Sequence, residues 1–213
     1  MIETAILAAA TFFATIGPLD VAAMFAAMTT KDTPKQRRRT AVRGTVIATI
    51  ILLVFALLGE KMLGSLGISL PALRIAGGIL LLLIGIEMVF AISSGGTSTT
   101  DEEEREAATR QDIAVFPLAT PLIAGPGAMG AAILLMADAA GQFLLQVTVI
   151  VSLLVILLLT LVGMLLATQL QRVLGITGMH VISRVFGVLL SALAVQYILD
   201  GIAQSGLLGG GAS

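Results

Sequence analysis

The sequence predicts an all-α polytopic membrane protein with six transmembrane helices, arranged as two inverted three-helix repeats. Three observations predict it. Of the 213 residues, 57% are hydrophobic and 12% are charged, whereas soluble domains are about 45 to 50% apolar. Several charge-poor runs have the length, about 20 residues, that a helix needs to cross a bilayer. A Gly-Pro pair inside one such run recurs 108 residues later inside another.

The apolar runs are predicted to be helices and not strands of a barrel. A run such as "FLLQVTVIVSLLVILLLTLVGMLLA" is continuous, and it lacks the two-residue alternation that marks a membrane strand. Inside a bilayer only helices and closed barrels satisfy their own backbone hydrogen bonds. The predicted spans are 4–30, 42–59, 70–92, 113–137, 142–166 and 182–206.

The chain is predicted to divide into two halves of three spans. Residues 1–92 form the first half and 113–213 the second, and the polar, acidic segment 93–112 links them. Lys and Arg accumulate in cytoplasmic loops. Ten of the 12 basic residues fall in or beside the first, third and fifth loops, and only Lys61 and Arg74 fall elsewhere. We therefore expect these loops in the cytoplasm and both termini outside.

Three collinear matches indicate that the second half duplicates the first. Besides the two Gly-Pro pairs, "LLGEKMLGSLGI" resembles "LLATQLQRVLGI", and Arg74-Ile-Ala-Gly77 resembles Arg184-Val-Phe-Gly187. Because each half has an odd number of spans, the second half crosses the membrane in the opposite sense, which is a common transporter design. The alternative is chance agreement among Leu, Gly and Ile. In the repeat Arg74 is expected to pair with a carboxylate or to cap helix carbonyls.

The two Gly-Pro pairs predict helix breaks at the centres of spans one and four. Proline is accommodated at the first position of a helix and disrupts its interior. Each pair can therefore end one half-helix and begin another, whose exposed N–H groups attract an anionic group. Such discontinuous helices hold small substrates in transporters. The alternative is a pair of simple kinks. Candidate substrate-binding residues are Gly17, Pro18, Asp20, Thr120, Gly125, Pro126 and Gly127.

Charges within the spans are further candidates. Asp20 follows the first break, so it can cap the new half-helix, bind a coupling cation or take up a proton. The equivalent residue in the second half is Ala128. The Glu87 side chain is expected to extend towards the membrane–water interface. The alternative is that it pairs with a buried arginine or takes part in a proton relay. Arg74 and Arg184 are candidate structural or coupling charges.

Composition argues against several other classes of protein. The sequence has no cysteine and one histidine, His180, so neither a thiolate metal site nor a disulfide is expected. The spans carry no Ser–His pair or metal-ligand cluster, and we expect no enzyme, metal or cofactor. The net charge of −1 indicates no nucleic-acid partner. No nucleotide-binding motif is recognisable.

Three motifs resemble the MarC family of bacterial and archaeal integral membrane proteins: "GPLDVAAMFAAMT", "LGISLPALRIAGGILLLLIGIEMV" and "FPLATPLIAGPGAM". The resemblance covers nearly the whole chain. It implies a six-span protein of the inner or plasma membrane, similar in design to LysE-type exporters, with a link to small neutral amino acids. It gives Pro18, Gly125, Pro126 and Gly127 a place in the substrate pathway. The family usually has Asn or Asp before the first proline and Gly two residues after it, where this chain has Gly17 and Asp20.

These observations predict a secondary transporter, an exporter or exchanger, for a small solute such as a neutral amino acid. A proton or sodium gradient would drive it. The alternatives are a passive channel and a non-transporting membrane scaffold. The expected partners are the solute, the coupling ion and the lipid bilayer; whether the chain forms a homo-oligomer is left open by the sequence.

Overall fold

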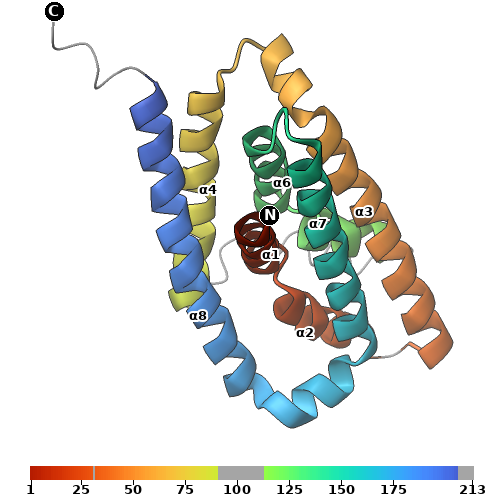
Figure 1. Cartoon of the computed structure of the whole chain (residues 1–213). Helices are drawn as coiled ribbons and strands as arrows, with labels where there is room; N and C mark the ends of the chain where they lie inside the picture. The colour runs from red at the N-terminus through yellow and green to blue at the C-terminus, as the bar shows by residue number, and fades with distance from the viewer. Residues whose placement is uncertain (31, 91–112, 206–213) are drawn as a thin grey trace, which may run out of the picture.

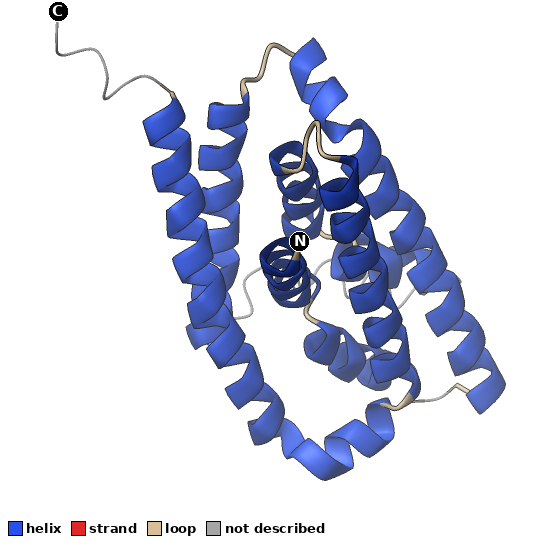
Figure 2. Ribbon diagram, in the orientation of Figure 1, coloured by secondary structure: helices blue, strands red, loops and turns tan. Residues whose placement is uncertain are grey.

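The computed structural model describes residues 1–30, 32–90 and 113–205, without the side chains of 168–177, 179 and 180. All regular elements in these ranges are helices (Figure 2). They are α1 (Ile2–Ile16), α2 (Pro18–Met28), α3 (Pro34–Ser65), α4 (Leu70–Phe90), η1 (Ala114–Ile123), α6 (Pro126–Asp138), α7 (Phe143–Leu165) and α8 (Ala167–Gln204). The predicted linker 93–112 lies outside the described residues, as do Lys31, Arg105 and Arg110.

The helix starts follow from proline and from capping side chains. Pro18, Pro34 and Pro126 are each the first residue of a helix, where the missing N–H would have had no helical acceptor. The start of α3 has a capping box as well. Thr33 Oγ1 accepts the Gln36 N–H at 3.3 Å, and Gln36 Oε1 accepts the Thr33 N–H at 2.9 Å. Two orphan donors are thereby satisfied.

The structure confirms an all-helical chain with several membrane-length helices. Among the described residues, five helical units are long and apolar enough to cross a bilayer, or six if the bent pair η1 and α6 counts as one span. Two helices differ clearly from the predicted spans. Helix α3 extends well beyond 42–59 at both ends, and α8 begins at Ala167 although 167–181 was expected to be a loop. No proline occurs after Pro126, so nothing local stops the helix there.

Helices α4 and α8 pack along each other at very close range (Figure 1). Glycine residues permit this close approach of the two helices. A Cβ atom on Gly78 would lie 2.7 Å from the Ala194 carbonyl oxygen, and one on Gly85 would lie 2.9 Å from the Gly187 carbonyl oxygen. Small residues at helix interfaces are the usual way in which membrane helices associate. This antiparallel pair forms one side of the molecule.

The other helices pack around the two broken segments. Helix α7 lies against α1 and α2, and α3 lies against η1 and α6. Large buried side chains such as Phe12, Phe25, Leu118 and Leu153 fill the interior. Many leucines and valines on the outer faces of α3, α4, α7 and α8 are exposed, as expected for surfaces that contact lipid.

Candidate functional site

The first break lies between α1 and α2. Gly17 has a left-handed backbone with φ 60° and ψ 62°, which ends α1 in the manner common for C-terminal glycines. Its N–H donates to the Phe13 oxygen at 3.0 Å, and its carbonyl accepts the Val21 N–H at 2.9 Å. Pro18 has no N–H, and Gly17 belongs to neither helix. The helical ladder is therefore interrupted, and the last carbonyls of α1 lose their helical donors.

Replacing Gly17 by alanine is expected to destabilise the protein by about 1 to 2 kcal/mol, because a Cβ atom disfavours the left-handed conformation. The measurement is the thermal midpoint of the detergent-purified protein. Gly64→Ala is the control, since Gly64 lies in α3 and a Cβ there would meet nothing within 4 Å. Equal midpoints for Gly17→Ala and the wild type would contradict the observed backbone conformation.

Asp20 lies in the first turn of α2 and folds back over the break. A Cβ atom on Gly17 would be 3.3 Å from Asp20 Oδ2. The Ser183 hydroxyl of α8 donates to the carboxylate, at 3.2 Å from each oxygen. Ser183 is 9% exposed, whereas Asp20 is exposed. The carboxylate thus joins α2 to α8 while part of it faces away from the protein. Sequence reasoning missed Ser183, because no motif marks it.

The second break is longer than the first. Phe116 and Thr120 have extended backbones inside η1, with φ near −135° and ψ 127°. Each precedes a proline, and the proline ring excludes the helical conformation of the residue before it. Hydrogen bonds there run five residues back, from the Ala124 N–H to the Ala119 oxygen at 2.9 Å. Gly125 then caps α6, and η1 and α6 meet at a bend of 54°.

Close backbone approaches fix the second break in place. A Cβ atom on Gly125 would lie 2.7 Å from the Pro121 oxygen, and one on Gly127 would lie 2.2 Å from Ile84 Cδ1 of α4. Gly125 and Gly127 are buried, Thr120 is half-buried and Pro126 is exposed. Gly127 therefore lies at the contact between α4 and the first turn of α6, and Gly125 packs against the end of η1.

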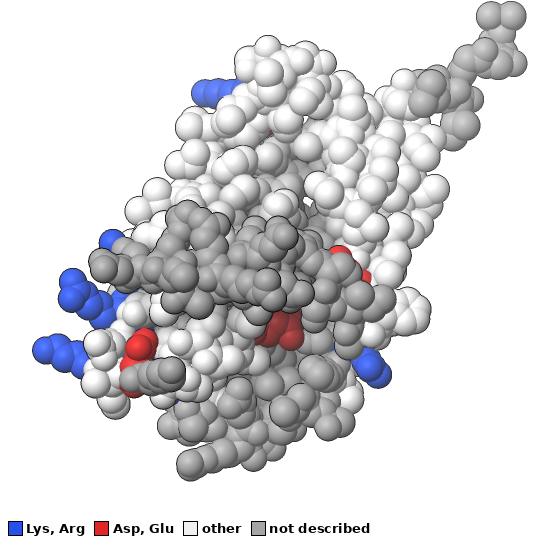
Figure 3. All heavy atoms as spheres, turned by 180° about the vertical axis from the view of Figure 1, so that it is seen from behind, with Lys and Arg blue, Asp and Glu red and all other residues white. Residues whose placement is uncertain are grey.

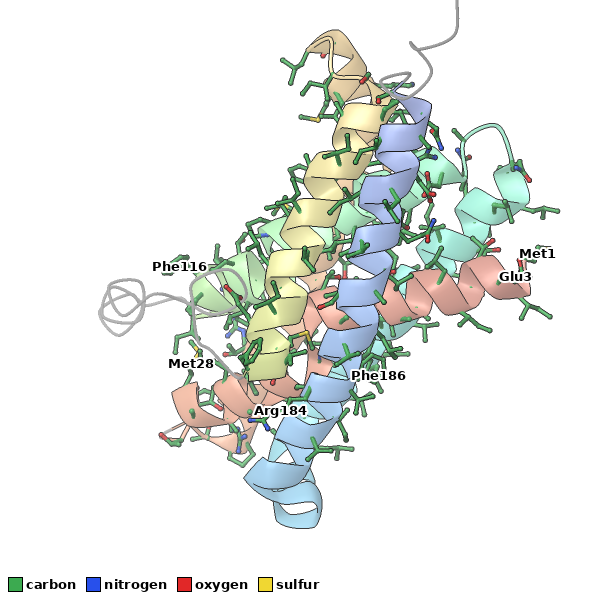
Figure 4. All side chains as sticks on the ribbon, turned by 90° about the vertical axis from the view of Figure 1, so that its left-hand side faces the viewer. Met1, Glu3, Met28, Phe116, Arg184 and Phe186 are labelled. Carbon is green, nitrogen blue, oxygen red and sulfur yellow. The ribbon has the colours of Figure 1, made fainter. Side chains whose placement is uncertain are left out.

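The two broken segments contact each other through α1 and α6. Figure 4 shows that they run in opposite directions: Met1 and Glu3 mark one side of the molecule, while Met28 and Phe116, the far end of α2 and the beginning of η1, lie on the other. The first turns of α2 and α6 therefore point in opposite senses within one bundle. Their free N–H groups and the interrupted carbonyls supply both donors and acceptors to the interior.

The charged candidates on the spans differ in their surroundings. Arg74 of α4 forms an ion pair with Asp138 at the end of α6, which is one of the two roles expected for it. Arg184, the residue that the predicted repeat pairs with Arg74, is exposed and forms no ion pair with a described residue. Figure 4 places Arg184 on α8 near the end of α2 that Met28 marks. Glu87 is half-buried on α4.

Basic side chains concentrate at one end of the molecule. Figure 3 shows most of the visible Lys and Arg residues in the lower half, with a basic side chain also at the opposite end. Arg37 and Arg38 lie in the first turns of α3, and the Arg37 guanidinium lies 5.9 Å from the centre of the Phe25 ring. Within the described residues, no group of three or more His, Asp or Glu side chains could hold a metal ion.

Comparison with known proteins identifies the family. The profile of the MarC family, described as MarC family integral membrane proteins, matches residues 2–205. A UPF0056 membrane protein of Methanocaldococcus jannaschii is 39% identical over 201 residues, which cover 92% of this chain and 95% of the relative. One from Archaeoglobus fulgidus is 33% identical over 196 residues, 91% of this chain and 90% of the relative.

The name of a further relative states in which membrane that relative lies. The UPF0056 inner membrane protein YhgN of Escherichia coli is 34% identical over 185 residues, covering 87% of this chain and 89% of the relative. No solved structure matches the chain. The family match and the identities agree with the apolar helices of the structure. This chain belongs to the MarC family of integral membrane proteins.

Proposed function

We propose that this protein is a secondary transporter for a small solute, most simply a small neutral amino acid, and that a proton or sodium gradient drives it. One observation carries the proposal. Two apolar segments are interrupted at Gly-Pro pairs, at Gly17-Pro18 and Gly125-Pro126, and the segments contact each other in opposite orientations. Paired broken helices of this kind form the substrate sites of transporters with inverted repeats.

The packing of the helices supports the inverted repeat on which this proposal depends. Helix α3 packs on the broken segment η1–α6, and its counterpart α7 packs on the broken segment α1–α2. Exchanging the halves therefore exchanges these contacts. The pair α4 and α8 would lie on the symmetry axis, since each is the counterpart of the other. A two-fold axis in the membrane plane relates such repeats in transporters.

Each break offers the groups that a zwitterion needs. The N–H groups of Gly127 and Ala128 open α6 without helical acceptors, and the partial positive charge of that helix end favours a carboxylate. The interrupted carbonyls of α1 can accept hydrogen bonds from an ammonium group or coordinate a cation. Thr120 and the prolines of the two Gly-Pro pairs, Pro18 and Pro126, shape the backbone around these groups. The main chain therefore supplies both the N–H donors and the carbonyl acceptors for the solute, and no catalytic or metal-binding side chain is needed.

Asp20 is the proposed coupling residue. Among the described residues it is the carboxylate in the first turn after a break, because Ala128 takes the equivalent place in α6 and is fully buried. The Ser183 hydroxyl helps to hold the carboxylate next to the break. A proton or sodium ion bound there would change the charge at the first break and at the contact between α2 and α8. Only one coupling ion per cycle would then be expected.

The proposed orientation places both termini outside the cell. The end of the molecule that carries the basic start of α3 would face the cytoplasm, as the distribution of Lys and Arg favours. The E. coli relative is named an inner membrane protein, which supports the same location for this chain. A cysteine introduced at Ser205, accessible to impermeant reagents from outside intact cells, would test the orientation.

Counterflow in proteoliposomes tests the proposal against its alternatives. Vesicles loaded with unlabelled alanine are expected to accumulate labelled alanine transiently, since a carrier exchanges solute across the bilayer. A channel equilibrates the label without accumulation. A scaffold gives no flux with alanine, glycine or a broad panel of other solutes, and that result would contradict the proposal.

Asp20→Asn is expected to abolish stimulation by an imposed gradient while leaving exchange measurable, because the amide cannot take up a proton or neutralise a cation. The measurement compares gradient-driven uptake with counterflow in the same vesicles. Ser183→Ala is the matched variant. It removes one hydrogen bond and keeps the carboxylate, so gradient stimulation should persist. If Asp20→Asn keeps full stimulation, Asp20 has no coupling role.

A further inference from the structure

A polar cluster at the end of the bundle away from the basic residues has features of a ligand site. We refer to it as the outer cluster: Arg74 of α4, Asp138 of α6, and Tyr197 and Gln204 of α8. It lies where α4 begins and where α6 and α8 end. Arg74 lies in two of the sequence motifs, but no motif pointed to Asp138, Tyr197 or Gln204. The two helix breaks do not include the cluster.

Some hydrogen-bond donors and acceptors of the outer cluster are not used within it. Arg74 Nε donates to Asp138 Oδ1 at 3.1 Å, and Nη2 donates to the same oxygen. Nη1 donates to Gln204 Oε1. A fork-to-fork pair would use both carboxylate oxygens, so here Asp138 Oδ2 is left for another donor. Arg74 has five N–H groups, and two of them are not used in these three bonds.

Tyr197 adds a second, independent sign of a ligand. Its side chain is 6% exposed, and its hydroxyl has no hydrogen-bond partner among the described residues. Buried tyrosine hydroxyls are normally bonded. Asp138, Arg74 and Asp200 are charged residues in the neighbourhood of this hydroxyl. The phenol, the unused guanidinium donors and the free carboxylate oxygen therefore belong to residues of one neighbourhood. The Arg74 and Asp138 side chains are 14% and 29% exposed, so their ion pair is half-buried.

We infer that the outer cluster is a recognition site for a free zwitterionic amino acid at the outer end of the pathway. The ligand carboxylate would take the spare Arg74 donors and the Tyr197 hydroxyl, and the ligand ammonium would take Asp138 Oδ2. Because the Arg74–Asp138 ion pair uses Asp138 Oδ1, a ligand on the remaining groups would bind beside the pair and leave it in place. The inference deepens the proposed function and rests on it for the role of the site in transport.

The chain contains a natural probe of this site. Tyr197 is its only tyrosine, and the sequence has no tryptophan, so tyrosine fluorescence of the whole protein reports on the outer cluster alone. The experiment titrates the detergent-purified full chain with alanine. Alaninamide, which lacks the carboxylate, and N-acetylalanine, which lacks the ammonium, are separate arms. Dispersed phosphatidylethanolamine is a fourth arm, because its headgroup has the same two charges.

Alanine is expected to change the tyrosine emission saturably, and the three other ligands to change it at least tenfold less effectively. Asp138→Asn should raise the apparent Kd for alanine at least tenfold, since the ammonium loses its charged acceptor. Glu60→Gln is the matched control, because Glu60 is an exposed carboxylate of α3 that does not belong to the outer cluster. It should leave the Kd within twofold.

Two further outcomes separate the site from a structural ion pair and from the proposed function. If Asp138→Asn lowers the thermal midpoint but leaves the alanine titration unchanged, or if only the lipid gives a signal, the inference is overturned. The charge exchange Arg74→Asp with Asp138→Arg keeps the pair and should retain folding. If counterflow persists while alanine gives no fluorescence change, the outer cluster is not an alanine site and the transport proposal stands. If alanine gives a saturable signal without any flux, the outer cluster binds alanine and the transport proposal fails.

Discussion

Replacing Gly187 by leucine is expected to force α4 and α8 apart and to destabilise the protein by about 3 kcal/mol, at the upper end of overpacking effects. A Cβ atom at this position would lie 2.9 Å from the Gly85 carbonyl oxygen and 2.8 Å from Met88 Cβ. Backbone atoms of a helix cannot move aside as the tip of a side chain can. A leucine there requires the whole helix to shift.

The measurement is thermal or denaturant unfolding of the detergent-purified protein, with Val188→Leu as the control. Val188 is the neighbouring residue of α8 and is 58% exposed, so the added methylene would contact lipid or detergent only. We expect a lower midpoint for Gly187→Leu and no change for Val188→Leu. The same midpoint for both variants would show that α4 and α8 do not approach each other as closely as described.

Gly125→Ala is expected to have the largest effect on function. The added Cβ would lie 2.7 Å from the Pro121 oxygen, which is a backbone atom within the same break. Relief of this contact requires the 54° bend between η1 and α6 to change, and the N–H groups at the start of α6 would turn with it. We expect a loss of about 1 to 3 kcal/mol in stability and at least a tenfold loss in exchange rate.

Gly130→Ala is the matched control for this substitution. Gly130 lies in the same helix, and a Cβ there would meet nothing within 4 Å. Alanine is favoured over glycine inside helices by about 1 kcal/mol, so this variant should be as stable as the wild type or slightly more so, and equally active. Loss of exchange in both variants would indicate that flexibility of α6 matters and not the geometry of the break.

The sequence was sufficient to predict the helical class, the approximate spans and both breaks. Apolar runs of bilayer length leave the backbone few alternatives, and proline at the first helical position is a strong local signal. Gly17-Pro18 and Gly125-Pro126 therefore mark helix starts before any packing is known. The length of α8 was harder to predict, because the residues 167–181 contain polar side chains and two glycines, which resemble a loop, but no proline to interrupt the helix.

Contacts between helices could not be predicted from the sequence. Ser183 and Asp138 become important only because α8 packs on α2 and α6 packs on α4, and one sequence does not say which faces meet. The irregular course of η1 has a local signal in the sequence. Both Phe116 and Thr120 precede a proline, and each therefore favours an extended backbone. That pattern could have predicted an unwound segment extending well before Gly125.

The central claim is that the backbone at the two breaks binds the transported solute. Its most direct test is counterflow of labelled alanine in proteoliposomes that contain equal amounts of wild type, Gly125→Ala or Gly130→Ala protein, each first checked for folding by its thermal midpoint. We expect transient accumulation of label with the wild type and Gly130→Ala, and at least tenfold slower exchange with folded Gly125→Ala. Equal exchange rates in all three would contradict it.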